Sequence, residues 1–434
     1  MQTRLHIGGS GRRIGPARLL ALGLAVAMGS AVPDIAAAQS ATERIQELER
    51  KLEQSLKTIE ELATRVRELE ARKAPLEEPA PAAPQVEEHH DRRFPAAAGA
   101  APTPPPPTLL RGFADVGANF SGNRGNKGFI NGSVDFYLTP QLTENIRAVM
   151  ELVFEHDDAG TLSPDLERLQ VGYTFNNALT VWGGRFHSPL GYWNTAFHHG
   201  QQLQTSVLRP RMIDFEDHGG VIPAHTVGVW ASGAVHTKSG RLTYDLFGGN
   251  SPSINANTLD PNNSGKQHPG YSSGFNLGYL FGGAADGLKV GMHGYRAVVR
   301  DDAVAVNITR MNILGGYAAL DSPVWEVIAE YYGFHNVDES GGSGNHRSWA
   351  GFAQLGHRFA RWIPFGRLER AALNQADNYF AELATGRAYR RQAVGLRYDL
   401  SPNTALKAEL VHTTTESGPT VSFNALLTQW AIRF

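Results

Sequence analysis

The chain of 434 residues contains no cysteine, which excludes both disulfide bridges and a lipid anchor attached to a cysteine. Beyond residue 38 it lacks any apolar run of 18 or more residues, so no segment there can cross a membrane as a helix. It also lacks an acidic calcium loop of the usual spacing. We therefore expect neither an enzyme nor a resident metal or other cofactor, and with a net charge of −2 no nucleic-acid partner.

The N-terminal residues have the pattern of a secretory signal peptide. Four arginines (Arg4, Arg12, Arg13 and Arg18) precede the apolar run at 19–28, and three alanines at 36–38 form a small-residue cleavage site before Gln39. Residues 1–38 are thus predicted to direct export from the cytoplasm.

Residues 39–73 have the pattern of an oligomerisation helix. Heptads between 42 and 73 place Ile45, Leu52, Ile59 and Val66 at one core position and Leu48, Ser55, Leu62 and Leu69 at the other, which predicts a coiled coil. These core residues favour a dimer, but Leu56 and Ala63 widen the apolar stripe, as a third helix requires. We expect a homotrimer, with a dimer as the alternative.

The segment 74–108 is rich in Pro and Ala and has too few large apolar residues to form a core. It is predicted to be a semi-extended linker between the coiled coil and the following domain. The two histidines at 89 and 90 are interpreted as solvated linker residues, since nothing near them holds a ligand set in place.

The region 109–434 is predicted to be a 16-stranded antiparallel transmembrane β-barrel, an all-β fold. Short turns alternate with long connections, as in a barrel whose two ends lie in the periplasm. The expected strands are 110–120, 128–138, 144–155, 166–175, 179–187, 225–235, 240–249, 272–282, 287–299, 303–319, 323–334, 347–358, 362–372, 389–400, 404–413 and 423–434.

The last strand shows the alternation most clearly. Phe434, Ile432 and Trp430 share one face, whereas Arg433 and Gln429 lie on the other. About 9–11 tilted residues are enough for a strand to cross a bilayer. Charged residues of the strands are expected to avoid the lipid face, and the predicted lumen-facing set is Arg147, Glu151, Arg185, Arg391, Arg397 and Asp399.

Together with the signal peptide, coiled coil and linker, the run Gly-Leu-Arg-Tyr-Asp-Leu-Ser-Pro-Asn-Thr-Ala-Leu-Lys-Ala-Glu at 395–409 and the terminal Phe434 resemble Gram-negative outer-membrane porins. The similarity is greatest to the phosphate-selective-porin-like group and to trimeric porins with an N-terminal coiled coil. It implies a trimeric barrel in outer-membrane lipid, with the coiled coil in the periplasm and Phe434 recognised by the barrel-assembly machinery. It also implies passive uptake of small hydrophilic solutes, with the third external loop folded inward as a constriction.

In this chain the third external connection, 188–224, is the longest of all. It carries aromatic residues and charges of both signs, and pores select by size and by charge at the narrowest point. The residues predicted to form the constriction are Trp193, Asn194, His198, His199, Arg209, Arg211, Asp214, Glu216 and Asp217.

The preferred solute is less well defined. The barrel region holds 26 Lys and Arg against 28 Asp and Glu, and only five of its cations are Lys. Arginine favours carboxylate and phosphate groups, which makes anionic solutes candidates, but the balanced charge does not support phosphate selectivity. The alternatives are a metal or metal-chelate uptake pore, suggested by His187, His198, His199, His218 and His225, an envelope tether, and an outer-membrane enzyme.

Overall fold

The computed structural model describes residues 109–121, 127–156, 162–197, 200–216, 218–261, 270–302, 307–340, 344–416 and 420–434, together with the isolated helical positions Arg50, Lys57 and Thr64. The predicted signal peptide, the linker and the rest of the coiled-coil segment lie outside the described residues. No helix within the described ranges is long and apolar enough to cross a lipid bilayer.

Sixteen strands of 9 to 16 residues form the wall of the domain, and two strands of three residues each accompany them. The wall strands are β1 (Leu109–Ser121), β2 (Gly128–Thr139), β3 (Ile146–His156), β4 (Leu162–Asn176), β5 (Leu179–His187), β6 (His225–Thr237), β7 (Gly240–Asn250), β10 (Tyr271–Phe281), β11 (Leu288–Asp301), β12 (Ile308–Asp321), β13 (Trp325–Ser340), β14 (Asn345–His357), β15 (Trp362–Ala372), β16 (Tyr389–Ser401), β17 (Thr404–Thr415) and β18 (Val421–Arg433). The short strands are β8 (Ser253–Asn255) and β9 (Thr258–Asp260).

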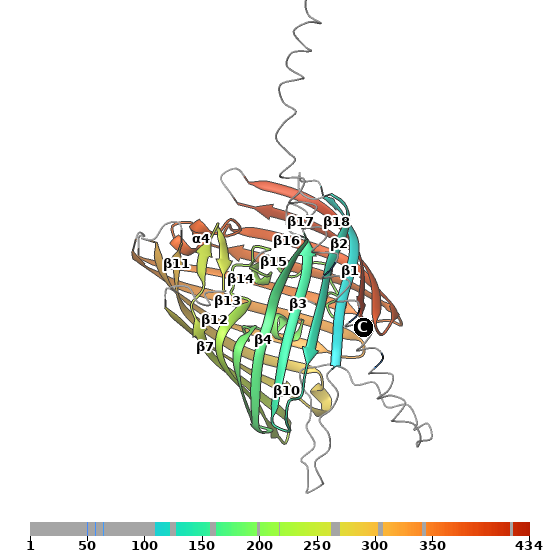
Figure 1. Ribbon diagram of the computed structural model, residues 1–434. Coiled ribbons are helices and arrows are strands. Elements are labelled where there is room, and N and C mark those ends of the chain that lie inside the picture. The colour runs from blue at the N-terminus through green and yellow to red at the C-terminus, as the bar shows by residue number, and fades with distance from the viewer. Residues whose placement is uncertain are drawn as a thin grey trace, which may run out of the picture. The chain divides into compact units, whose positions relative to one another are not determined.

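Each wall strand pairs antiparallel with the next, and β18 pairs with β1 to close the ring (Figure 1). The short β8–β9 hairpin lies in the connection between β7 and β10 and touches the wall through a parallel pairing with β11. The prediction of a closed 16-stranded antiparallel barrel is thus confirmed. At the seam, Gly112 and Phe434 exchange two backbone hydrogen bonds of 2.9 Å, so the terminal residue takes part in barrel closure.

All sixteen predicted strands are present, and the errors lie at their ends. The strand expected at 303–319 begins only at Ile308, and the strand expected at 166–175 already begins at Leu162. In the second case the pairing with β3 shifts by one residue between Leu166 and Arg168, leaving Glu167 as the extra residue of a β-bulge. Such a bulge interrupts the period of two on which strand prediction relies.

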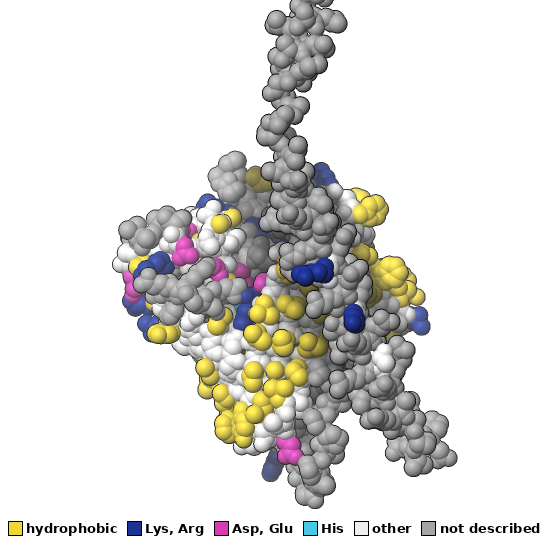
Figure 2. Space-filling model, viewed as in Figure 1, with side chains coloured by type: hydrophobic (Ala, Val, Ile, Leu, Met, Phe, Trp, Pro, Cys, Tyr) yellow, Lys and Arg dark blue, Asp and Glu magenta, His cyan; other side chains and the backbone are white. Residues whose placement is uncertain are grey.

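Alternation along the strands separates an apolar outer face from a polar inner one. In β16, Val394 is 58% exposed whereas Arg397, three residues on, is only 8% exposed. In β18, Trp430 is exposed and Gln429 is buried, and Phe434, directly after the strand, is exposed, as the sequence predicted. Figure 2 shows hydrophobic side chains gathered over the outer face of β3 and β4, away from the charged groups near the strand ends.

The main hydrophobic core lies inside the barrel rather than between layers. It is formed by inward side chains of the wall, such as Tyr332 and Phe352, and by residues of the connection 188–224, such as Leu190, Trp193 and Met212. The longest predicted external loop therefore supplies six of the 26 buried residues of this core.

Candidate functional site: the loop that crosses the barrel

The connection 188–224, here called the inner loop, is closed at its neck. The Ser188 amide donates to the Ala224 carbonyl over 2.7 Å. The Asn194 side chain donates to the carbonyls of Ser188 and Ala224, at 2.8 and 3.1 Å, so it connects the incoming and outgoing chain. Asn194 was predicted to be a constriction residue, and the structure places it at the base of the loop, buried.

From this neck the inner loop reaches β13. Its short helix α3 (Trp193–Ala196) begins at the carboxylate of Glu330. The Trp193 amide donates to Glu330 Oε1 at 2.7 Å, and the Tyr192 amide donates to Oε2 at 3.1 Å. The Tyr332 hydroxyl, on the same strand, donates to the same carboxylate over 2.7 Å. A carboxylate at a helix start satisfies amides that have no partner within the helix.

Two further glutamates receive backbone amides in the same way. Glu409 of β17 accepts from the amides of Val207 and Leu208 at 2.6 and 3.0 Å. Glu369 of β15 accepts from the amide of Arg211 at 2.8 Å. All three wall glutamates are at least 95% buried, so the inner loop supplies hydrogen bonds that water cannot.

Three wall cations bind the carbonyl groups of the same loop. Arg367 donates to the Leu208 carbonyl at 2.9 Å, and also to the side chains of Glu369 and Glu409. Arg397 donates to the carbonyls of residues 202 and 204 at 2.7 and 2.9 Å. Lys407 donates to the carbonyls of residues 201 and 206.

These six wall residues, Glu330, Glu369, Glu409, Arg367, Arg397 and Lys407, are called the far-wall anchors below. They lie on β13, β15, β16 and β17, whereas the inner loop leaves the wall from β5 and returns to β6, half-way around the ring. The loop consequently spans the interior. The six anchors comprise three carboxylates and three cations, so their formal charges sum to zero.

Arg209 and Asp214, both predicted to line a constriction, lie within the folded loop. The buried Arg209 guanidinium donates to the Ile213 carbonyl and to Asn194 Oδ1, at 3.1 and 3.2 Å for Nη2, and lies 4.0 Å from the ring centre of Phe215. Burial lowers the pKa of Arg209 and raises the pKa of Asp214. Trp193 is also fully buried, against Phe352.

Arg211 and Arg391 present guanidinium groups that are only partly covered. Arg211 Nη1 donates to Thr415 Oγ1 at 2.9 Å, and Arg391 Nε donates to Thr413 Oγ1 at 3.1 Å. Burial, and next the charge of Arg391, lower the pKa of Arg211. Two neighbouring cations, one from the loop and one from the wall, therefore share this part of the interior.

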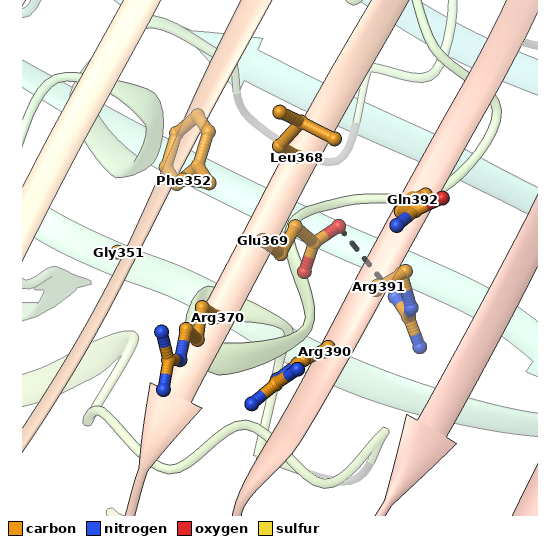
Figure 3. A pocket seen from close by; sticks show the side chains of 8 residues that line it. All are labelled: Gly351, Phe352, Leu368, Glu369, Arg370, Arg390, Arg391 and Gln392. Carbon is orange, nitrogen blue, oxygen red and sulfur yellow. Dashed lines mark ion pairs between the residues drawn. The ribbon is translucent and has the colours of Figure 1, made fainter.

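Figure 3 shows the wall beside this pair, where Glu369 points toward Arg391 at 3.9 Å. A shallow pocket here also has Arg370 and Arg390 in its lining. These two residues are opposite each other in β15 and β16, and both are exposed on the outer face of the barrel. Their position on that face separates them from the interior, so the pocket is not the candidate pore.

The other predicted lumen residues take part in contacts along the wall. Arg147 lies over the Trp182 ring at 4.7 Å, and Glu151 forms an ion pair with Arg168. Arg185 lies 3.5 Å from Glu167, and Asp399 accepts from Arg397 at 2.8 Å. Glu216 binds His225, as described below. His198, His199 and Asp217 lie outside the described residues.

Sequence reasoning missed most of the far-wall anchors. Arg367 and Glu369, like Lys407 and Glu409, are charged residues two apart in predicted strands, and a spacing of two places both on one face. That signal was present and identified a charged inner face. It could not identify the loop backbone that these side chains bind.

Comparison with known proteins finds fold neighbours without sequence relatives. No protein-family model and no curated protein matches the chain. OmpF of Salmonella typhi, in complex with daunomycin, is 10% identical over 75% of this chain and 97% of its own, with a TM-score of 0.51. The outer membrane channel DcaP of Acinetobacter baumannii is 12% identical over the same shares, with a TM-score of 0.50. Both are outer-membrane porins with a 16-stranded barrel, and the similarity shows a common fold.

Proposed function

We propose that the protein is an outer-membrane pore for the passive diffusion of small hydrophilic solutes, with the inner loop as its constriction. The observation that carries this proposal is the fastening of the loop to the far wall by buried side chains of both signs. A loop held in this way narrows the interior without closing the barrel by a second sheet or a plug domain.

Anionic solutes are the preferred class within this proposal. The reason is the pair formed by Arg211 and Arg391, whose nearest carboxylate, Glu369, already accepts from Arg367 at 2.9 Å and from the Arg211 amide. Fixed charges at a narrow, poorly hydrated passage act strongly on a passing ion. Phosphate is one member of this class, and the structure gives no reason to prefer it to a carboxylate.

The assembly and location belong to the same proposal. Heptads at 42–73 support a homotrimer with its coiled coil in the periplasm, and the exposed apolar outer face supports contact with outer-membrane lipid. Phe434 at the seam supports recognition by the barrel-assembly machinery. The far-wall anchors are used in holding the loop, so we assign the site no catalytic role.

Planar-bilayer recordings on the full-length protein test the proposal. We expect a defined unit conductance in the wild type, and a reversal potential across a low-salt gradient that indicates anion preference. Replacing Arg211 and Arg391 with Gln should shift that potential toward cations. The matched control replaces Arg370 and Arg390 with Gln, which removes the same charge from the outer face.

Each outcome of the recordings has a separate meaning. Absence of any unit conductance would contradict the pore itself. A conducting protein whose reversal potential is the same in the wild type and in the Arg211/Arg391 variant would retain the pore and reject the anionic preference. An equal shift in the Arg370/Arg390 control would show that the effect is not specific to the interior.

A further inference from the structure

A compact group of metal-ligand side chains lies at the root of the inner loop. Glu167 is in β4, His187 is the last residue of β5, and His225 is the first residue of β6. One ligand atom from each lies within 4.8 Å of the others, and all three side chains are buried. None of the six far-wall anchors belongs to this group.

Strand geometry explains why the three meet. His187 and His225 are directly paired in register, one on each side of the loop that they enclose. Strand β5 pairs with β4 only as far as Arg185 and Leu169. Just before that point, Gly184 has a φ of +131°. A Cβ at this position would lie 2.0 Å from the Leu169 carbonyl oxygen, so position 184 requires glycine.

A fourth residue, Glu216 of the inner loop, holds one imidazole in position. Its Oε2 lies 2.9 Å from His225 Nδ1, and its Oε1 accepts from the His225 amide at 2.9 Å. When Nδ1 carries the proton of that hydrogen bond, Nε2 presents its lone pair on the opposite side of the ring, where Glu167 Oε2 lies 2.7 Å away. A carboxylate bound to the far nitrogen of a ligand histidine is the usual second layer of a zinc site.

Buried carboxylates lie close to both imidazoles, which favours a bound cation. Three buried carboxylates, Glu151, Glu167 and Glu216, lie within 4 Å of the two rings. Arg168 pairs with Glu151, Arg185 lies beside Glu167, and the charge of Arg209 acts on Glu216. Phe215 stacks on His225 with ring centres 5.8 Å apart and covers the group from the loop side.

We propose that Glu167, His187 and His225 bind a divalent transition-metal ion of the zinc class, which clamps the two ends of the inner loop. Two imidazoles and one carboxylate form a known protein ligand set for zinc, with bonds of about 2.0–2.2 Å. Tetrahedral bonds of that length separate ligand atoms by roughly 3.4 Å, so atoms within 4.8 Å of one another reach it by side-chain adjustments of about 1 Å. The site does not depend on the solute of the pore.

A metal-free arrangement is the competing explanation of the same contacts. A protonated His225 would bridge Glu167 and Glu216 as an ion pair, with both ring nitrogens donating. The two arrangements differ in one observable respect: the bridge has no place for a metal ion between Glu167 and His225.

Cobalt(II) is the probe because it takes zinc sites and absorbs visible light. The full-length protein, purified in detergent and treated with a chelator, is titrated with Co²⁺. We expect a saturable tetrahedral absorption band at one equivalent per chain, which Zn²⁺ then abolishes. The Glu167→Gln variant should bind at least 10-fold more weakly, and Glu216→Gln about 10–100-fold more weakly.

A cysteine substitution identifies the ligand directly, because the natural chain contains no cysteine. His187→Cys should add a sulfur-to-cobalt charge-transfer band in the ultraviolet. The matched control is His218→Cys, whose position in the same loop is 52% exposed in the wild type and outside the group. That variant should give no such band at one equivalent.

The proposal is overturned if the wild type binds no Co²⁺ at one equivalent, or if Glu167→Gln binds it as tightly as the wild type does. Co²⁺ binding by His187→Cys without the sulfur band would also reject it. If His187→Cys does not give the heat-modifiable barrel, the wild-type and Glu167→Gln titrations alone decide. A pore that conducts normally but binds no metal would reject this inference and leave the proposed function intact.

Discussion

The inner loop is held by different chemistry at the far wall, which binds its middle, and at its root, where its two chain ends meet. At the far wall, side chains bind the loop backbone, as Glu409 does with the amides of Val207 and Leu208, and the charges of the anchors balance. At the root, side chains bind side chains, as His225 does with Glu216 and Glu167. The far wall can therefore hold the loop without any added ion, whereas the root is suited to receive one.

This difference determines what substitutions should do. Removing one partner of a buried, hydrogen-bonded ion pair typically costs about 3–5 kcal/mol, because the other charge remains buried. At the far wall this cost is unavoidable. At the root a bound cation would change the local charge, so the cost of a substitution depends on the metal content of the sample.

The largest effect is expected for Arg367→Met. Arg367 binds Glu369, Glu409 and the Leu208 carbonyl, and is 99% buried. Its loss should weaken the anchoring of the loop by about 3–5 kcal/mol and raise both the unit conductance and its noise. Hydrogen exchange of residues 205–211 measures the anchoring. Arg370→Met, three residues along the same strand on the outer face, is the control and should behave like the wild type.

A smaller effect is expected for Glu409→Gln. The amide oxygen still accepts from Val207 and Leu208, but the charge that balances Arg367 is lost. Hydrogen bonds to charged groups contribute about 1.5–3 kcal/mol, against about 1 kcal/mol for neutral ones. Exchange of the Val207 and Leu208 amides should accelerate by roughly 10-fold, since about 1.4 kcal/mol corresponds to that factor. Unchanged exchange would show that the loop does not rely on this charge.

Zinc should stabilise the root of the inner loop without affecting the segment bound to the far wall. One equivalent of Zn²⁺ added to chelator-treated protein is expected to slow hydrogen exchange at residues 218–225 by several-fold and to leave residues 205–211 unchanged. Equal slowing of hydrogen exchange at residues 218–225 and 205–211 would mean that the ion acts on the barrel as a whole. The Glu167→Gln variant should lose the response at the root.

The smallest effect is expected from a change of pH. It acts through the connection 373–388, which contacts the inner loop near its root. Asp377 caps α4 (Asn378–Glu382), and Tyr379 in that helix donates to the Val221 carbonyl over 2.6 Å. Burial raises the pKa of Asp377 to about 6, from an ordinary value near 3.8. Because the pKa of Asp377 is higher in the folded loop than in the unfolded chain, the protonated carboxyl stabilises the folded loop at pH values below about 4. This contribution is lost as pH rises from about 4 to 6.

Hydrogen exchange of residues 373–388, corrected for intrinsic rates, should therefore show more protection at pH 4.5 than at pH 7. In Asp377→Asn this difference should disappear. A pH response that persists in the variant would assign the titration to a group other than Asp377.

Much of the barrel was predictable because its signals are local. The alternation of short turns with long connections and the period of two in β18 each depend on neighbours a few positions away. The errors at β4 and β12 arose where this period fails, at a bulge and at a strand end. The identity of 188–224 as the longest loop was likewise readable from the chain.

The site was less predictable, as Arg209 illustrates. In the sequence it is a charge in a long loop, and a role at the constriction was inferred from that position. In the structure its guanidinium lies between loop carbonyls and Phe215, so its substitution should first disturb the loop. Its place in a constriction stays a prediction, and Arg211 and Arg391 are the better pair for testing selectivity.

The sequence by itself determined the barrel, the number of its strands and the loop long enough to cross it, because alternation, turn residues and connection length are properties of short segments. The tertiary structure alone decided which buried charges hold that loop and which histidines meet at its root. Glu409 and Val207 are 202 residues apart in the sequence, and Arg367 and Leu208 are 159 residues apart. No local pattern specifies such a pair. Closure of the barrel brings the members of each pair within hydrogen-bond distance. The contact is then required, because burying an unpaired charge is costly.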